Sequence, residues 1–83
     1  MSPTPLEKKA VVALGQAIKE FRKKKGLTQE ELAQRTELHE SYISVLESGR
    51  RNPTHGTVRR ISRGLGVSLL ELVQRADELE RKG

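Results

Sequence analysis

The segment from Thr28 to Gly49 constrains the fold more than any other part of this chain, because it spells two short helices separated by a tight turn. Thr28 is followed three residues later by Glu31, which makes a capping box at the start of the first helix. The second helix carries Ile43 and Leu46 three residues apart on its inner side. Gly49 then supplies the left-handed residue that ends it. Residues 28–49 therefore predict a helix-turn-helix.

The outer side of the second helix is built from small residues. At 3.6 residues per turn, Ser41, Ser44, Val45 and Ser48 fall opposite Ile43 and its neighbours. A protein partner more often meets bulky aromatic or aliphatic anchors. A face of small residues instead fits a DNA major groove, which is about 12 Å wide.

The rest of the chain predicts three further helices and no strand, so we expect an all-α, five-helix fold with one domain over residues 1–83. Residues 6–24 form a long amphipathic helix after a frayed start at residues 1–4. A fourth helix follows Thr54, and a last helix covers about residues 68–81. The apolar stripe of the first helix is Leu6, Ala10, Leu14, Ala17, Ile18 and Phe21, and that of the fourth is Val58, Ile61 and Leu65.

The last helix carries more leucine than a small core needs. It begins with a second capping box, Ser68 and Glu71, and Leu70 lies beside its apolar stripe. We interpret the surplus as a homodimer interface. Its residues are Leu69, Leu72, Val73, Ala76 and Leu79.

The formal net charge of +5 indicates a polyanionic partner, and its distribution is uneven. Residues 19–25 have a balance of +4 and residues 48–70 a balance of +5, whereas residues 26–47 between them have −4. Positive charge thus flanks the second helix of the pair, as contacts to the two backbones of a groove would require. Solvated basic faces on ordinary surface helices are the alternative.

Composition excludes several other classes. The chain has no cysteine and no apolar run near the ~20 residues of a membrane helix, so we expect a soluble cytoplasmic protein. His39 and His55 start different helices and do not make a metal pair. The sequence shows no nucleophile with a base, no paired acids and no phosphate loop. We therefore expect no enzyme activity, no cofactor and no small-molecule ligand. A basic first helix without tryptophan argues against membrane binding.

Four pieces of sequence occur together in order: Leu27 to Ala33, Ser41 to Ser44, Leu46 to Pro53 and Leu65 to Ser68. Over about residues 13–72 they resemble the phage-repressor and Cro class of helix-turn-helix proteins, the XRE family of bacterial regulators. The resemblance implies a compact, lambda-repressor-like DNA-binding domain.

The resemblance also implies roles for single residues. Gln29, which opens the first helix of the pair, is expected to bind a phosphate and to touch the start of the recognition helix, and Arg22 and Glu47 are expected to form a partly buried ion pair. Base contacts are expected from His39, Glu40, Ser41, Ser44 and Val45. Phosphate contacts are expected from Gln29, Tyr42, Arg50, Arg51, Asn52 and Thr54, with Lys25 as an addition.

The sequence departs from the family pattern at three positions. Glu37 stands in the turn where glycine is usual, so either the turn carries about 1 kcal/mol of left-handed strain or its geometry differs. Glu40 and Val45 stand where relatives often have arginine, which shifts binding toward phosphates and DNA shape.

These observations lead to one functional hypothesis and one alternative. We expect sequence-specific binding of double-stranded DNA at a palindromic operator by a homodimer, in a transcriptional regulator of repressor or controller type. The alternative is a protein-interaction module or an antitoxin-like partner-binding protein, supported by the balance of −4 over residues 26–47.

Overall fold

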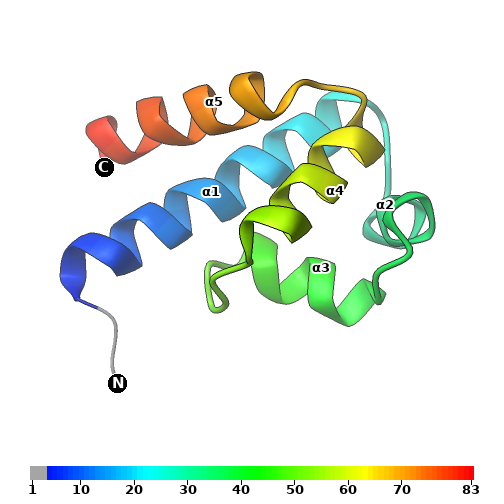
Figure 1. Cartoon of the computed structure of the whole chain (residues 1–83), viewed down its shortest axis with the longest axis horizontal. Helices are drawn as coiled ribbons and strands as arrows, with labels where there is room; N and C mark the ends of the chain where they lie inside the picture. The colour runs from blue at the N-terminus through cyan, green and yellow to red at the C-terminus, as the bar shows by residue number, and fades with distance from the viewer. Residues whose placement is uncertain (1–3) are drawn as a thin grey trace.

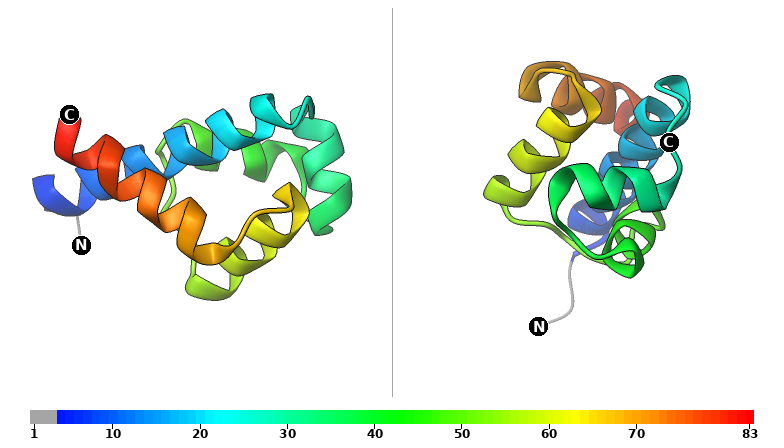
Figure 2. Two further views of the ribbon diagram at one scale, coloured as in Figure 1. Left: turned by 90° about the horizontal axis from the view of Figure 1, so that it is seen from above. Right: turned by 90° about the vertical axis from the view of Figure 1, so that its right-hand side faces the viewer.

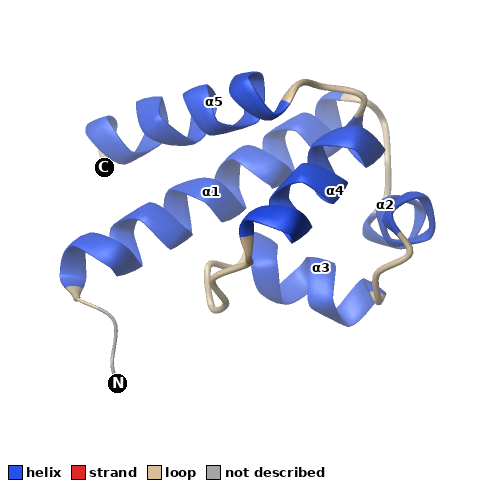
Figure 3. Cartoon of the chain, in the orientation of Figure 1, coloured by secondary structure: helices blue, strands red, loops and turns tan. Residues whose placement is uncertain are grey.

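The computed structural model describes residues 4–83, and these residues form five helices and no strand (Figure 1, Figure 3). The helices are α1 (Pro5–Lys24), α2 (Gln29–Thr36), α3 (Glu40–Glu47), α4 (His55–Leu65) and α5 (Leu69–Lys82). The predicted all-α, five-helix class is confirmed. Residues 1–3 of the predicted frayed start lie outside the described residues.

Side-chain caps start four of the helices. Both predicted capping boxes form: the Thr28 hydroxyl accepts from the backbone N–H of Glu31 at 3.0 Å, and the Glu31 carboxylate accepts from the N–H of Thr28 at 2.9 Å. Ser68 and Glu71 bond in the same way. Thr4 also caps a helix, because its hydroxyl accepts from the N–H of Glu7. The prediction that fraying extends to Thr4 is therefore wrong.

The turn between α2 and α3 has left-handed geometry although it contains no glycine. Glu37 ends α2 with φ 58° and ψ 32°, and the N–H of the next residue, Leu38, bonds the carbonyl of Ala33 at 3.0 Å. The chain thus keeps the usual turn shape and accepts the strain of a side chain there. After α3, Gly49 takes φ +74°, as predicted.

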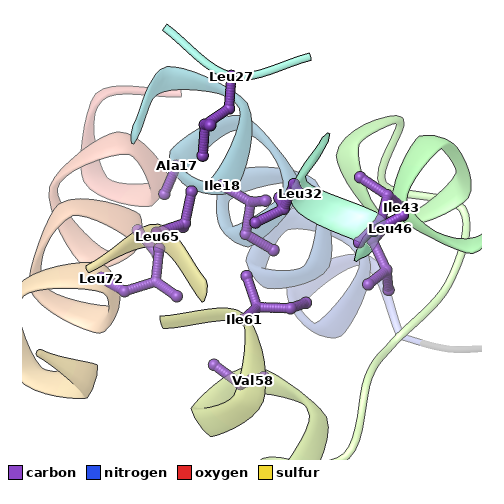
Figure 4. Packing of buried hydrophobic residues seen from close by; sticks show 12 residues of the cluster. Ala17, Ile18, Leu27, Leu32, Ile43, Leu46, Val58, Ile61, Leu65 and Leu72 are labelled. Carbon is purple, nitrogen blue, oxygen red and sulfur yellow. The ribbon is translucent and has the colours of Figure 1, made fainter. Parts of the chain in front are cut away.

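All five helices contribute to one core, which Figure 4 shows from close by. Burying one such aliphatic side chain stabilises the fold by about 1.5–3 kcal/mol, so these contacts fix how the helices pack. The largest fully buried side chains are Ile18, Leu32, Ile43, Leu46, Ile61, Leu65 and Leu72.

Helices α1 and α5 run side by side, so that both described ends of the chain lie at the same end of the molecule (Figure 1, Figure 2). This packing corrects two predictions. Leu72 and Ala76 are 0% and 9% exposed and belong to the chain's own core, so they do not face a partner subunit. Leu6, predicted on the inner stripe, is 71% exposed.

Leu69 and Leu79 are half-buried against the core, and only Val73 of the predicted dimer set is well exposed, at 47%. Leu70, which the sequence places beside the stripe, is 70% exposed. Within residues 4–83, no helix is both long enough and apolar enough to cross a membrane.

Candidate nucleic-acid interface

Helix α3 lies along one edge of the molecule, with one side against the core and one side outward (Figure 1). Ile43 and Leu46 occupy the inner side and are nearly inaccessible to solvent. The residues predicted to contact bases are all on the accessible side. His39, Glu40 and Ser41 are exposed, and Ser44 and Val45 are half-buried.

A buried ion pair fixes the C-terminal end of α3 to α1. The Nε of Arg22 donates to Oε2 of Glu47 at 2.6 Å, and its Nη2 donates to Oε1 at 3.0 Å. The third bond of Arg22 goes from Nη1 to the backbone carbonyl of Leu27 at 2.7 Å. Both charged residues are 8% exposed, so the pair that the resemblance implied is present and lies inside the protein.

Gln29 joins this network from the start of α2. Its Nε2 donates to Oε1 of Glu47 at 3.1 Å. Because Glu47 is the last residue of α3, this bond reaches the end of the helix, whereas the resemblance implied a contact at its start. The side chain is half-buried and stays near the surface.

Close backbone packing holds α1 against the same end of α3. A Cβ on Gly15 would overlap the carbonyl oxygen of Leu46 and would lie 2.9 Å from that of Glu47. Any side chain at residue 15 would therefore push α3 away from α1. Nothing local in the sequence indicates this role for Gly15, because the neighbours that require it are more than 30 residues away in the chain.

The loop between α3 and α4 presents the second group of predicted phosphate contacts. Arg50, Arg51, Asn52 and Thr54 are all exposed. The Nε of Arg50 donates to the Ser48 hydroxyl at 2.9 Å, and this hydroxyl donates to the Val45 carbonyl at 2.8 Å.

Tyr42 helps to position the loop. It is half-buried, and the guanidinium of Arg51 lies 5.9 Å from the centre of its ring, within the range of a cation–π contact. Arg51 thus lies against α3, and Arg50 bonds the residue that caps it.

The polar groups around α3 fall into two sets. One set is Lys25, which follows α1, and Gln29, which opens α2. The other set comes from the loop after α3: Arg50, Arg51, Asn52 and Thr54. An accessible helix face with cationic and amide donors from two nearby segments has the groups that a major groove and its phosphate backbones require.

The two histidines belong to different parts of the structure: His39 precedes α3 and His55 opens α4. Among residues 4–83, no three metal-ligating side chains come together.

A second basic surface lies outside the predicted site. Arg35, Arg59, Arg60 and Arg63 line a cleft of about 550 Å³ between α2 and α4. The three α4 arginines belong to the positive charge of residues 48–70, but nothing in the sequence indicates that Arg35 lies beside them.

The geometry agrees with comparisons to known proteins. The helix-turn-helix family model matches residues 18–72. The chain belongs to this family. A relative named as an uncharacterized HTH-type transcriptional regulator, y4dJ of Sinorhizobium fredii, is 46% identical over 65 residues, which are 78% of this chain and 84% of the relative. The resemblance inferred from the sequence is confirmed.

Two solved helix-turn-helix structures show the same fold. The clp gene regulator ClgR from C. glutamicum superposes with a TM-score of 0.81 at 32% identity, over 94% of this chain and 96% of that one. The restriction-modification controller protein C.Esp1396I, solved as a tetramer with its natural 35 base-pair operator, gives 0.81 at 32% identity over 87% and 95%. The family and these relatives are regulators and not enzymes, which confirms the expectation for this chain.

Proposed function

We propose that this helix-turn-helix protein binds double-stranded operator DNA sequence-specifically as a homodimer and thereby regulates transcription. The observation that carries the proposal is the accessible face of α3 together with two sets of donors, one at the start of α2 and one in the loop after α3. The C.Esp1396I complex supports it, because a protein of this fold binds an operator.

In this proposal α3 enters the major groove and reads bases with its outward side chains. The Glu40 carboxylate accepts from a cytosine amino group, and Val45 packs on a thymine methyl group. Ser41 and Ser44 bond bases or phosphates, and His39 lies at the entrance of the helix. None of these residues is an arginine, so strong bidentate guanine contacts are absent from this face.

The phosphate backbones are held from both sides of α3. Lys25 and Gln29 contact one backbone, and Gln29 is held by Glu47, which is itself buried and bonded to Arg22. The second backbone is contacted by Arg50, Arg51, Asn52, Thr54 and the Tyr42 hydroxyl. Phosphate contacts supply most of the affinity in this arrangement, and base contacts with DNA shape supply the specificity.

Dimerisation places two copies of α3 in successive major grooves about 34 Å apart on a palindromic operator. The interface is best supported at the exposed residues Leu70 and Val73 of α5. Val73 and half-buried Leu69 border a groove of about 490 Å³ whose apolar wall also includes Leu14 and Val58. A second copy covering this surface buries apolar area that the free chain leaves in water.

Binding to random and selected duplexes over a salt series tests the proposal. DNA affinity should fall by about 10³ between about 50 and 200 mM salt if six phosphates are contacted. Replacing Arg50 and Arg51 by alanine should weaken binding to every sequence and reduce the salt slope by about 2. The matched control, Lys9→Ala with Lys82→Ala, removes the same charge near the C-terminal end of α5 and should leave the slope unchanged.

Two results would contradict the proposal. A folded protein that binds no duplex at low salt would favour the protein-interaction alternative. A double Arg50 and Arg51 variant with wild-type slope would remove the loop from the DNA contact.

A further inference from the structure

The cleft between α2 and α4 is lined by four arginines that form no ion pairs within residues 4–83. Arg35, Arg59, Arg60 and Arg63 line the cleft, and Glu37 is the only acidic residue with them. All four are exposed, so an anion from outside the chain can reach them.

The two helices that line the cleft pack closely against each other. The Nη1 of Arg35 donates to the Gly64 carbonyl at 3.4 Å and so links α2 to α4 across the cleft. Thr36 is 2% exposed, and its hydroxyl bonds the carbonyl of Leu32 at 2.8 Å. A Cβ on Gly64 would lie 2.6 Å from Cγ2 of Thr36, which shows how closely the helices meet. A preformed site loses less entropy when it binds.

The type of cation also matters. All basic residues of the cleft are arginines, whereas the end of α1 carries Lys23, Lys24 and Lys25. The planar guanidinium binds both oxygens of one anionic group with two parallel bonds, whereas an ammonium acts as a point charge. The arginines of the cleft are therefore suited to carboxylates or phosphates held in a defined geometry.

Position argues against the DNA backbone as the ligand. The proposed phosphate contacts come from the start of α2 and from the loop after α3, whereas Arg35 lies near the opposite end of α2. Helix α4 rises away from α3 toward its C-terminal end (Figure 1). Gly56 and Gly64, at the two ends of the cleft, are eight residues apart, or about 12 Å along the axis. The arginines of the cleft thus come from other parts of the chain than the proposed phosphate contacts.

We propose that the arginine cleft between α2 and α4 is a docking site for an acidic segment of a partner protein, which it can hold while α3 is on DNA. The segment lies between the two helices, and its carboxylates bond Arg59, Arg60 and Arg63. An acidic chain fits this space because it is narrow and flexible, whereas a duplex is wide and stiff.

Fluorescence anisotropy with a labelled peptide tests the proposal on the full chain. The probe is an alternating Glu-Gly peptide of about eight residues, which spans about 26 Å when extended. The control peptide carries Gln in place of Glu. At about 50 mM salt, the Glu peptide should bind at least about tenfold more tightly than the Gln peptide.

Two protein variants locate the binding. Arg60→Gln with Arg63→Gln should lose about tenfold in affinity for the Glu peptide. Lys19→Gln with Lys23→Gln removes the same charge from α1, outside the cleft, and should bind the peptide as the wild type does. Circular dichroism verifies folding, and Arg59→Gln with Arg63→Gln replaces the first cleft variant if that one unfolds.

The same variants also test whether a DNA backbone or a second copy of this chain occupies the cleft instead. The cleft variant should keep its DNA affinity and salt slope, and the peptide should bind the protein–DNA complex. A reduced DNA salt slope would assign the cleft to a phosphate backbone, and loss of the dimer in sedimentation would assign it to a second copy of this chain. Equal loss of peptide binding in the cleft and α1 variants would also overturn the proposal. Peptide binding by the wild type in the absence of any DNA binding would refute the proposed function and leave the docking site standing.

Discussion

Glu37 shows how a single residue can keep the shape of a turn at a cost. Its backbone is left-handed, a conformation in which a Cβ is crowded by the neighbouring carbonyl. The sequence left two geometries open at this position. The structure has the usual one, because the following residues of α3 must reach the core through Ile43 and Leu46.

Replacing Glu37 with glycine should stabilise the protein by about 0.5–1 kcal/mol, because glycine adopts φ 58° without steric strain. Urea unfolding measures the difference. Glu37→Ala is the matched control, since it removes the same carboxylate and keeps the Cβ, and it should give no gain. Equal gains in both variants would show that the charge of Glu37 matters and its backbone does not.

The Arg22–Glu47 pair is the other residue-scale determinant of the site. Replacing Arg22 with alanine should destabilise the protein by about 3–5 kcal/mol, because it leaves the Glu47 carboxylate buried without its partner. Arg22→Met combined with Glu47→Leu should recover most of that loss in urea unfolding. A single variant that loses less than about 1 kcal/mol would contradict the burial of the pair.

At the scale of elements, local signals in the sequence were sufficient to predict where the helices begin and end. Capping boxes at Thr28 and Ser68 and the glycine after α3 involve residues three or four apart, so their outcome depends little on the rest of the fold. The Arg22–Glu47 pair was also identified, through the family resemblance. Contacts between distant segments were not identified: nothing local indicates that Gly15 meets Leu46 or that Arg35 lies beside Arg63.

Helix α5 shows the same limit. Its apolar stripe predicts burial but does not say what covers it. In the structure α5 packs on α1, and Leu72 and Ala76 are buried. Of the residues predicted to form a dimer interface, only Val73 is well exposed. An amphipathic pattern defines a face, and only the packing of the other helices decides whether that face is already occupied.

A surface ion pair joins α1 to α5 and makes the packing pH-dependent. Arg75 donates to both oxygens of Glu20, at 2.7 and 3.1 Å, and these bonds lower the pKa of Glu20 below its ordinary value of 4.5. A carboxylate whose pKa is lowered by folding stabilises the folded state above its unfolded pKa. This contribution is lost as the pH falls through the lowered value.

Glu20→Gln should therefore cost about 0.2–1 kcal/mol near neutral pH, the range of exposed pairs. The difference from the wild type should shrink below about pH 4.5, where this carboxylate is protonated in the unfolded chain, and should vanish below the lowered pKa of the folded state. Urea unfolding at several pH values measures it. Glu80→Gln serves as a control, because Glu80 forms no ion pair within residues 4–83. A Glu20→Gln cost that is the same at all pH values would rule out the linkage.

At the scale of the whole molecule, we expect different residues of α5 to determine folding stability and dimer formation. Leu70→Asp with Val73→Asp should convert the proposed dimer to a monomer with little loss of stability, because both side chains already face water in the free chain. Leu72→Ala should instead cost about 2–5 kcal/mol and leave the interface residues in place. Sedimentation velocity and thermal unfolding distinguish the two effects. A Leu70 and Val73 variant that stays dimeric would move the interface elsewhere.

The attachment of α3 by its inner side has a consequence for the diversification of such proteins. Ile43, Leu46 and Glu47 hold the helix, and none of them belongs to the set proposed to read bases. The solvent-facing positions of α3 are therefore free to exchange side chains while the scaffold remains folded. We expect that substituting the outward residues of α3 by those of a related protein would give this chain the DNA sequence preference of that protein. The melting temperature should change little.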